Sequence, residues 1–150
     1  MGRYSTLRSE LVDAINTQLA TDLIAQVTVT PYPPYGNSFT SGDHIWLGAI
    51  RTEQEQATQG PGSRLEEGEL DVIIQTPIRT GAGQNEWAQA EIRGELLIAS
   101  LETLLANDFT IDGAAWDTEV ASIINNVEVV DDKGAPLGRV TLTIRFQNYL

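Results

Sequence analysis

The chain has 150 residues with 21 acidic and 9 basic side chains, so its formal net charge at pH 7 is −12. This length predicts one domain over residues 1–150, and a hydrophobic share of 41% is typical of a globular protein. The absence of cysteine excludes disulfides and zinc–thiolate sites. The acidic balance argues against sequence-specific nucleic-acid binding. No apolar run approaches the roughly 20 residues that cross a bilayer, so no membrane contact is expected.

The first 43 residues predict a helix, a strand and a loop. Residues 5–20 carry leucine and isoleucine at four-residue steps, after Ser5 or Thr6 as the cap. Residues 23–30 alternate valine with threonine, which predicts a half-buried strand. Three prolines from position 31 onward end that strand, so a loop is expected as far as residue 43.

Two further strands, 44–51 and 69–76, predict a hairpin. Its distal part, about residues 52–68, offers no apolar face and turns at Gly60-Pro61-Gly62. A polar arm of this kind either moves freely or pairs with another chain. The residues expected to make that contact are Glu53, Gln54, Glu55, Gln56, Arg64, Glu66 and Glu67.

The second half predicts a long helix and a second hairpin. Residues 86–106, capped by Asn85, carry an apolar stripe, and Glu91 is expected to turn to solvent at its start. The stripe consists of Trp87, Ala90, Gly94, Leu97, Ile98, Leu101, Leu104 and Leu105. An irregular segment (107–118) leads to strands at 123–130 and 139–149. The whole order predicts an α+β fold, with a mostly antiparallel sheet and both helices packed on one face.

Several patterns that could carry catalysis are incomplete. His44 opens a strand without cysteine or a G-x-S-x-G elbow, which favours a structural role. Gly81-Ala82-Gly83 lacks the third glycine and the lysine of phosphate loops. Glu67, Glu69 and Asp71 share one strand face, but no apolar pocket is evident that would raise a carboxyl pKa for glycoside hydrolysis. We therefore expect no enzyme, no catalytic residue and no cofactor.

One segment has the spacing of a calcium loop. Asp108, Asp112, Gly113 and Glu119 follow a helix almost as in D-x-[DN]-x-[DN]-G-x(5)-E. Thr110 replaces an acidic or amide ligand, and the residues after Glu119 favour a strand over the second helix. A plain helix-to-strand connection is the simpler interpretation, and a calcium-binding module remains the alternative of a different class.

The element order and the string Asp43-His44-Ile45-Trp46-Leu47-Gly48-Ala49-Ile50-Arg51-Thr52-Glu53-Gln54-Glu55 resemble the tail terminator (tail completion) proteins of long-tailed bacteriophages. In that family this hairpin strand is followed by a polar loop and an acidic return strand, here Leu65 to Glu69. A long helix and a C-terminal hairpin then complete the domain. The resemblance covers nearly the whole chain.

The resemblance implies a ring of six identical subunits on the end of a finished tail tube. Such a ring stops tube polymerisation and offers a surface for head–tail joining. Its partners would be further copies of itself, the tail tube protein and a head-completion or stopper protein, with DNA only passing through the lumen. The implied location is the tail–neck junction of the virion, and the host cytoplasm during assembly. A head-side stopper or adaptor of the same neck is the closely related alternative.

Overall fold

The structure is a computed structural model that describes residues 2–33, 42–55, 65–77, 84–108, 110, 111, 113, 115, 117–129 and 136–149. Within these ranges, the side chains of residues 54, 55, 65, 84–87, 127–129, 136, 137, 148 and 149 lie outside the description. The predicted turn at 60–62, the glycine segment 81–83, residues 131–135 of the second predicted hairpin and most of the predicted loop 31–43 also lie outside it.

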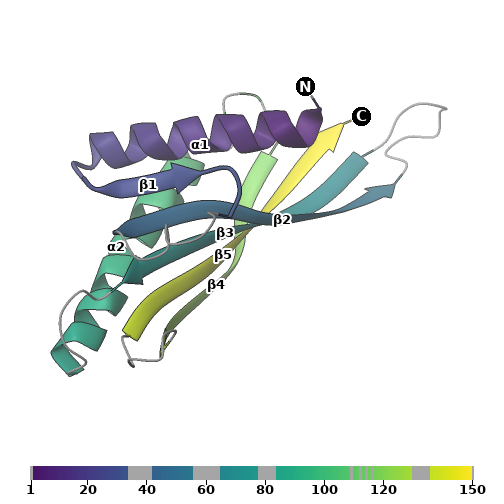
Figure 1. Cartoon of the computed structure of the whole chain (residues 1–150). Helices are drawn as coiled ribbons and strands as arrows, with labels where there is room; N and C mark the ends of the chain where they lie inside the picture. Colours follow the sequence, from purple (N-terminus) through teal and green to yellow (C-terminus); the bar gives the residue numbers. More distant parts are fainter. Residues whose placement is uncertain are drawn as a thin grey trace.

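Two helices and five strands follow the predicted order (Figure 1). They are α1 (Arg3–Thr21), β1 (Val27–Thr30), β2 (Asp43–Glu55), β3 (Leu65–Pro77), α2 (Gln84–Asn107), β4 (Asp117–Val129) and β5 (Pro136–Tyr149). The strands form one sheet in the order β1-β2-β3-β5-β4. Only the β1–β2 pair is parallel, so the predicted α+β fold with a mostly antiparallel sheet is confirmed.

One face of the sheet and both helices build the core. Leu7, Leu11, Ile15 and Leu19 of α1 are buried, as the four-residue spacing predicts. They share one cluster with the inward residues of β2, β3 and β5 and with the stripe of α2. The stripe is buried as predicted from Ala90 to Leu105, whereas the side chain of Trp87 lies outside the described residues. Glu91 is exposed, also as predicted.

The ends of α1 differ from the prediction. The helix begins at Arg3, and its N-cap is Gly2, which makes no side-chain cap bond. Ser5 and Thr6 therefore lie inside the first turn, and the Thr6 hydroxyl donates to the Gly2 carbonyl. At the other end the amide of Ile24 donates to the carbonyl of Leu19, and the amide of Leu23 donates to that of Ala20. This pattern is a Schellman motif, with Leu23 in the left-handed position that glycine usually holds.

Two strand boundaries are also corrected. The predicted strand 23–30 begins only at Val27, because Leu23 and Gln26 have positive φ angles of 58° and 64° that no strand residue adopts. The predicted strand 123–130 begins earlier, at Asp117. Residues 117 and 118 belong to the segment predicted to be irregular, yet they pair with Gln147 and Phe146 of β5.

The predicted arm is shorter than expected, because residues 65–68 belong to the sheet. β3 begins at Leu65 and pairs with β5 as well as β2. Phe146 of β5 covers Gly68 so closely that a Cβ there would lie 2.4 Å from the ring. The prediction that the whole stretch 52–68 has no apolar face to pack on is therefore wrong for residues 65–68, the start of β3. Residues 56–64 lie outside the described part of the chain.

Candidate functional site

The base of the β2–β3 hairpin carries most of the residues that the sequence marked for partner contact. β2 and β3 stay paired out to Glu55 and Leu65. Glu53 is exposed and Glu67 is half-buried, and the two residues face each other across the strands. Gln54 and Glu55 lie in β2 with undescribed side chains, and Gln56 and Arg64 lie outside the described residues. We call the paired ends of the two strands, residues 52–55 of β2 and 65–68 of β3, the arm base.

Glu66 points the opposite way from Glu67, into the molecule. Its side chain is fully buried, and the Arg3 guanidinium contacts it, with Nη2 2.8 Å from Oε2 and Nε 3.1 Å from Oε1. The Tyr4 hydroxyl donates to Oε2 at 2.8 Å and lies 3.2 Å from the hydroxyl of Thr52. The hydrogen bond to Glu66 raises the pKa of Arg3. Glu66 thus ties the arm base to the first turn of α1, and a partner contact through its carboxylate, as predicted, does not fit this burial.

Charged side chains alternate across the outer face of the sheet at the arm base. Arg51 binds both carboxylate oxygens of Asp71 at 2.9 Å and reaches Glu69 at 3.3 Å. Arg145 binds Glu119 at 3.0 Å and lies 3.9 Å from Glu69. These pairs follow directly from the register, since Arg51, Glu69, Arg145 and Glu119 occupy one row across β2, β3, β5 and β4.

Five carboxylates share this surface with two guanidinium groups, so it is net acidic. Arg51, Thr52, Glu53, Glu67, Gly68, Glu69 and Arg145 line an open hollow of about 340 Å³. Glu67 accepts a hydrogen bond from the Gln147 amide at 3.1 Å. The hydrogen bond from Arg51 lowers the pKa of Asp71, which is the reverse of the shift that a general acid needs. The three carboxylates of β3 therefore resemble a solvated ladder of ion pairs more than a hydrolase site.

The Asp108–Glu119 segment does not gather its acidic side chains within the described residues. Asp108 accepts a hydrogen bond from the Thr110 hydroxyl at 3.2 Å, and Glu119 pairs with Arg145. Asp112 lies outside the described residues. Ile111 is buried in the core, so the connection packs its apolar side chain inward. Glu119 lies in β4, which begins before the predicted strand, and β4 continues from Glu119 as a strand and not as the second helix of a calcium loop. Among the described residues, no group of three histidine or acidic side chains could hold a metal ion.

His44 is buried on β2, where the sequence favoured a structural role. Its Nε2 lies 3.0 Å from the Thr30 hydroxyl, and its ring meets Trp46 edge to face with centroids 5.7 Å apart. Burial lowers the pKa of His44. These contacts involve a hydroxyl and an aromatic ring and no acidic side chain, so the geometry is that of a neutral packed histidine.

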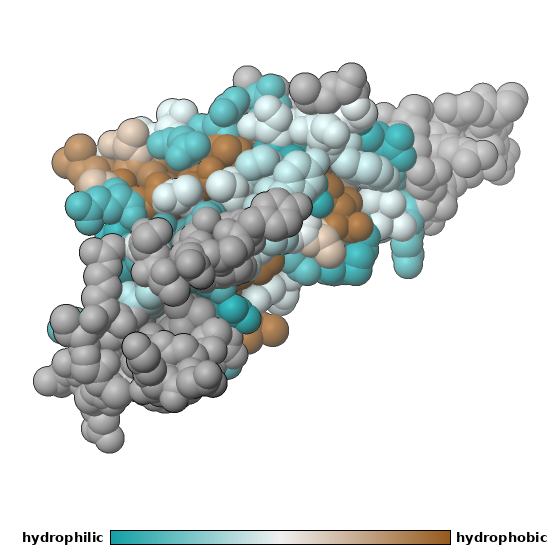
Figure 2. Space-filling model, in the orientation of Figure 1, coloured by the Kyte–Doolittle hydropathy of each residue, from teal (hydrophilic) through white to brown (hydrophobic). Residues whose placement is uncertain are grey.

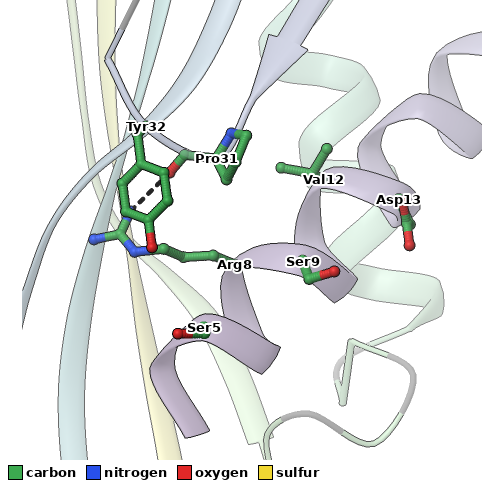
Figure 3. Close-up of a pocket in the computed structure, with 7 residues that line it drawn as sticks. All are labelled: Ser5, Arg8, Ser9, Val12, Asp13, Pro31 and Tyr32. Atoms are coloured by element: carbon green, nitrogen blue, oxygen red, sulfur yellow. Dashed lines mark hydrogen bonds between the residues drawn. The ribbon is translucent and has the colours of Figure 1, made fainter. Parts of the chain in front are cut away.

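Arg8 holds a position that the sequence did not reveal. Its guanidinium donates to the carbonyls of Pro31 at 3.0 Å, Leu47 at 3.2 Å and Gly48 at 2.7 Å. The Tyr32 ring stacks on it with the centroid 4.8 Å away, beside an open hollow of about 250 Å³ between α1 and the end of β1 (Figure 3). Arg8 thereby covers the edge of β2 just beyond the last residue that β1 pairs. These contacts join residues that are 23 to 40 positions apart in the sequence, and no local sequence motif predicts them.

Comparison with known proteins gives little beyond this. No family model matches the chain, and no curated protein matches it. Among solved structures, it is similar to a chain of the structure described as "Virion of native gene transfer agent (GTA) particle", with 13% identity over 93% of this chain and 95% of that one. The TM-score is 0.42, a likeness that supports no functional assignment. In the described part of the chain, neither helix is both long and apolar enough to cross a membrane.

Proposed function

We propose that this protein is a structural virion protein that closes the end of a bacteriophage tail tube as a homohexameric ring. The ring would stop tube polymerisation and present a surface for head–tail joining at the tail–neck junction. It acts through protein contacts, so the proposal assigns it no catalytic step, no metal and no cofactor.

The observation that carries the proposal is the place of the Asp43–Glu55 string within the confirmed order of elements. The apolar first half of the string is buried at Ile45, Trp46 and Leu47. Its polar second half runs outward to Glu55, opposite the acidic return strand. This division agrees with the hairpin of the tail terminator proteins that the sequence resembles.

The arm base has features suited to holding a partner in a fixed orientation. Glu66 joins it to α1, and the ladder of Arg51, Glu69, Arg145 and Glu119 spans four strands. A stiff base limits the ordering cost when the hairpin meets a neighbour. Its net acidic outer surface favours partners with basic side chains and would repel the phosphates of passing DNA.

The proposal is tested by the mass and shape of the protein in solution. We expect sedimentation and negative-stain images of the full chain to show rings of six, either alone or after mixing with tail tubes of its own phage. A chain that stays monomeric in both conditions refutes the proposal. Rings that attach to DNA-filled heads and ignore tube ends would replace it with the stopper or adaptor alternative.

A further inference from the structure

We infer that neighbouring copies join edge to edge through the sheet, with β4 of one copy paired antiparallel to β1 of the next. The inference rests on the proposed ring, for which it names the contact between subunits. The partner that each sheet edge binds is therefore a second copy of this chain.

Both ends of the sheet are open within the described residues. β1 and β4 each have one neighbouring strand, and within the described residues no backbone hydrogen bond from a turn or loop reaches either of them. Proteins normally protect such edges with charges, prolines or bulges. β1 reads Val-Thr-Val-Thr, and Val120–Val127 of β4 contains no charge, proline or glycine. A bulge lies only at one end of this β4 stretch, between Val120 and Ser122.

Exposed apolar side chains gather at the same two edges. Leu23 is 91% exposed at the end of α1, in the connection that leads to β1, and Tyr32 is 55% exposed shortly after β1 ends. On β4, Ile124 is 64% and Ile123 is 40% exposed. These are four of the six large hydrophobic side chains exposed in the described structure, and the other two lie on α2. In Figure 2, hydrophobic surface appears at the end of α1 where the chain turns into β1. Apolar surface at both edges is what a contact between copies would bury.

The two edges lie level with each other and run in opposite directions. One row of the sheet joins Thr28 to His44, Gln75, Arg139 and Asn126, and another joins Thr30 to Ile124. β1 is thus level with the uncharged part of β4. Three antiparallel steps separate the two strands, so a copy placed beside another in the same orientation presents its β1 antiparallel to the neighbour's β4. A contact between two different surfaces of one chain is also what closes a ring.

The absence of cysteine allows a direct test by disulfide crosslinking. Thr28 and Asn126 are both exposed, so Thr28→Cys and Asn126→Cys leave the core untouched. Within one chain these positions are four strand spacings apart, on the order of 19 Å, which no disulfide spans. Across the proposed contact they would lie about 5 Å apart. We expect the oxidised double variant to form a covalent ladder up to six chains on a denaturing gel, and each single variant to remain uncrosslinked.

Controls separate this contact from other modes of assembly. Thr28→Cys combined with Ala99→Cys, an exposed residue of α2, reports random collisions and should give no ladder. A covalent dimer of Asn126→Cys alone would reveal a two-fold β4–β4 contact and overturn the inference. A second double variant, Thr28→Cys with Ile124→Cys, tests a contact that is shifted by two residues. If rings form but neither double variant crosslinks, the edge contact is overturned and the proposed function stands. If no assembled species forms at all, both the edge contact and the proposed ring are refuted.

A charge placed on the edge gives an independent measurement. Ile124→Lys should abolish rings without changing the melting temperature of the monomer, because the side chain is mostly exposed. Ile92→Lys, at a similarly exposed position of α2, is the matched control and should keep them. Equal assembly of the two variants contradicts the edge contact.

Discussion

Replacing Leu23 by glycine should stabilise the fold, although it removes a large apolar side chain. Leu23 ends α1 with a φ of 58°, in the Schellman position where a side chain strains the backbone. The motif is formed by hydrogen bonds that the backbone amides of Leu23 and Ile24 donate, and these bonds do not involve the leucine side chain. The substitution therefore keeps the helix end and relieves the strain.

The size of the effect follows from three contributions. Relief of the left-handed strain is worth about 1–2 kcal/mol. The greater freedom of glycine in the unfolded chain offsets about 0.5–1 kcal/mol of that gain. The lost side chain is 91% exposed, so its remaining burial contributes only about 0.2 kcal/mol. The net gain in the free energy of unfolding is about 0.5 kcal/mol, or about 1–2 °C in melting temperature for a chain of this length.

Urea unfolding and thermal melts of the full chain measure this gain. Leu23→Ala is the matched control, since it removes the same contacts but keeps a Cβ in the left-handed conformation, and it should not stabilise the fold. Gln26→Gly, at the second positive φ of the same connection, should show a similar gain. A glycine variant less stable than the alanine variant would refute the reasoning and assign Leu23 a packing role.

Three further outcomes are expected. Tyr4→Phe removes a hydrogen bond to the buried Glu66 carboxylate and should cost about 1.5 kcal/mol in urea unfolding, whereas an unchanged midpoint would show that Arg3 alone satisfies it. Because burial lowers the pKa of His44, the unfolded chain takes up a proton that the fold rejects, and stability should fall as pH drops below about 6.5. His44→Gln should flatten that slope in melts between pH 5 and 7, and an identical slope would assign it to other groups. Replacing residues 56–64 by Asn-Gly, a turn that fits the Glu55–Leu65 pair, should keep a cooperative melt and weaken binding to tail tubes; loss of the melt would place structural contacts in that segment.

Local periodicity was enough to predict the elements and the core. The four-residue spacing of α1 and the alternation in β5 describe residues whose burial depends on one face of one element. The predicted ends of helices and strands were wrong where the backbone conformation of a single residue determines the end. Leu23 and Gln26 are common residues, and their spacing does not reveal a positive φ. The start of β4 was missed because its polar residues pair with β5 instead of filling the core.

The candidate site was only partly predictable, because its contacts join distant segments. Glu53 and Glu67 follow from the polar pattern of the hairpin. Glu66 reads as one more acidic residue of that pattern, and its burial depends on Arg3, which lies 63 residues away. The role of Arg8 likewise depends on carbonyls that the fold brings to it. Long-range pairing of this kind leaves no trace in local spacing.

The interior place of β5 in the sheet has a consequence for the order of folding. β5 follows the other four described strands in sequence, yet it lies between β3 and β4 in the sheet, and Leu65 pairs with Tyr149. Neither β3 nor β4 can complete its hydrogen bonding before this segment has emerged from the ribosome. Contacts of such long sequence separation form slowly and late. A nascent chain that ends before β5 therefore lacks a finished sheet, and the strand pairing that supports the arm base forms only after β5 has been added.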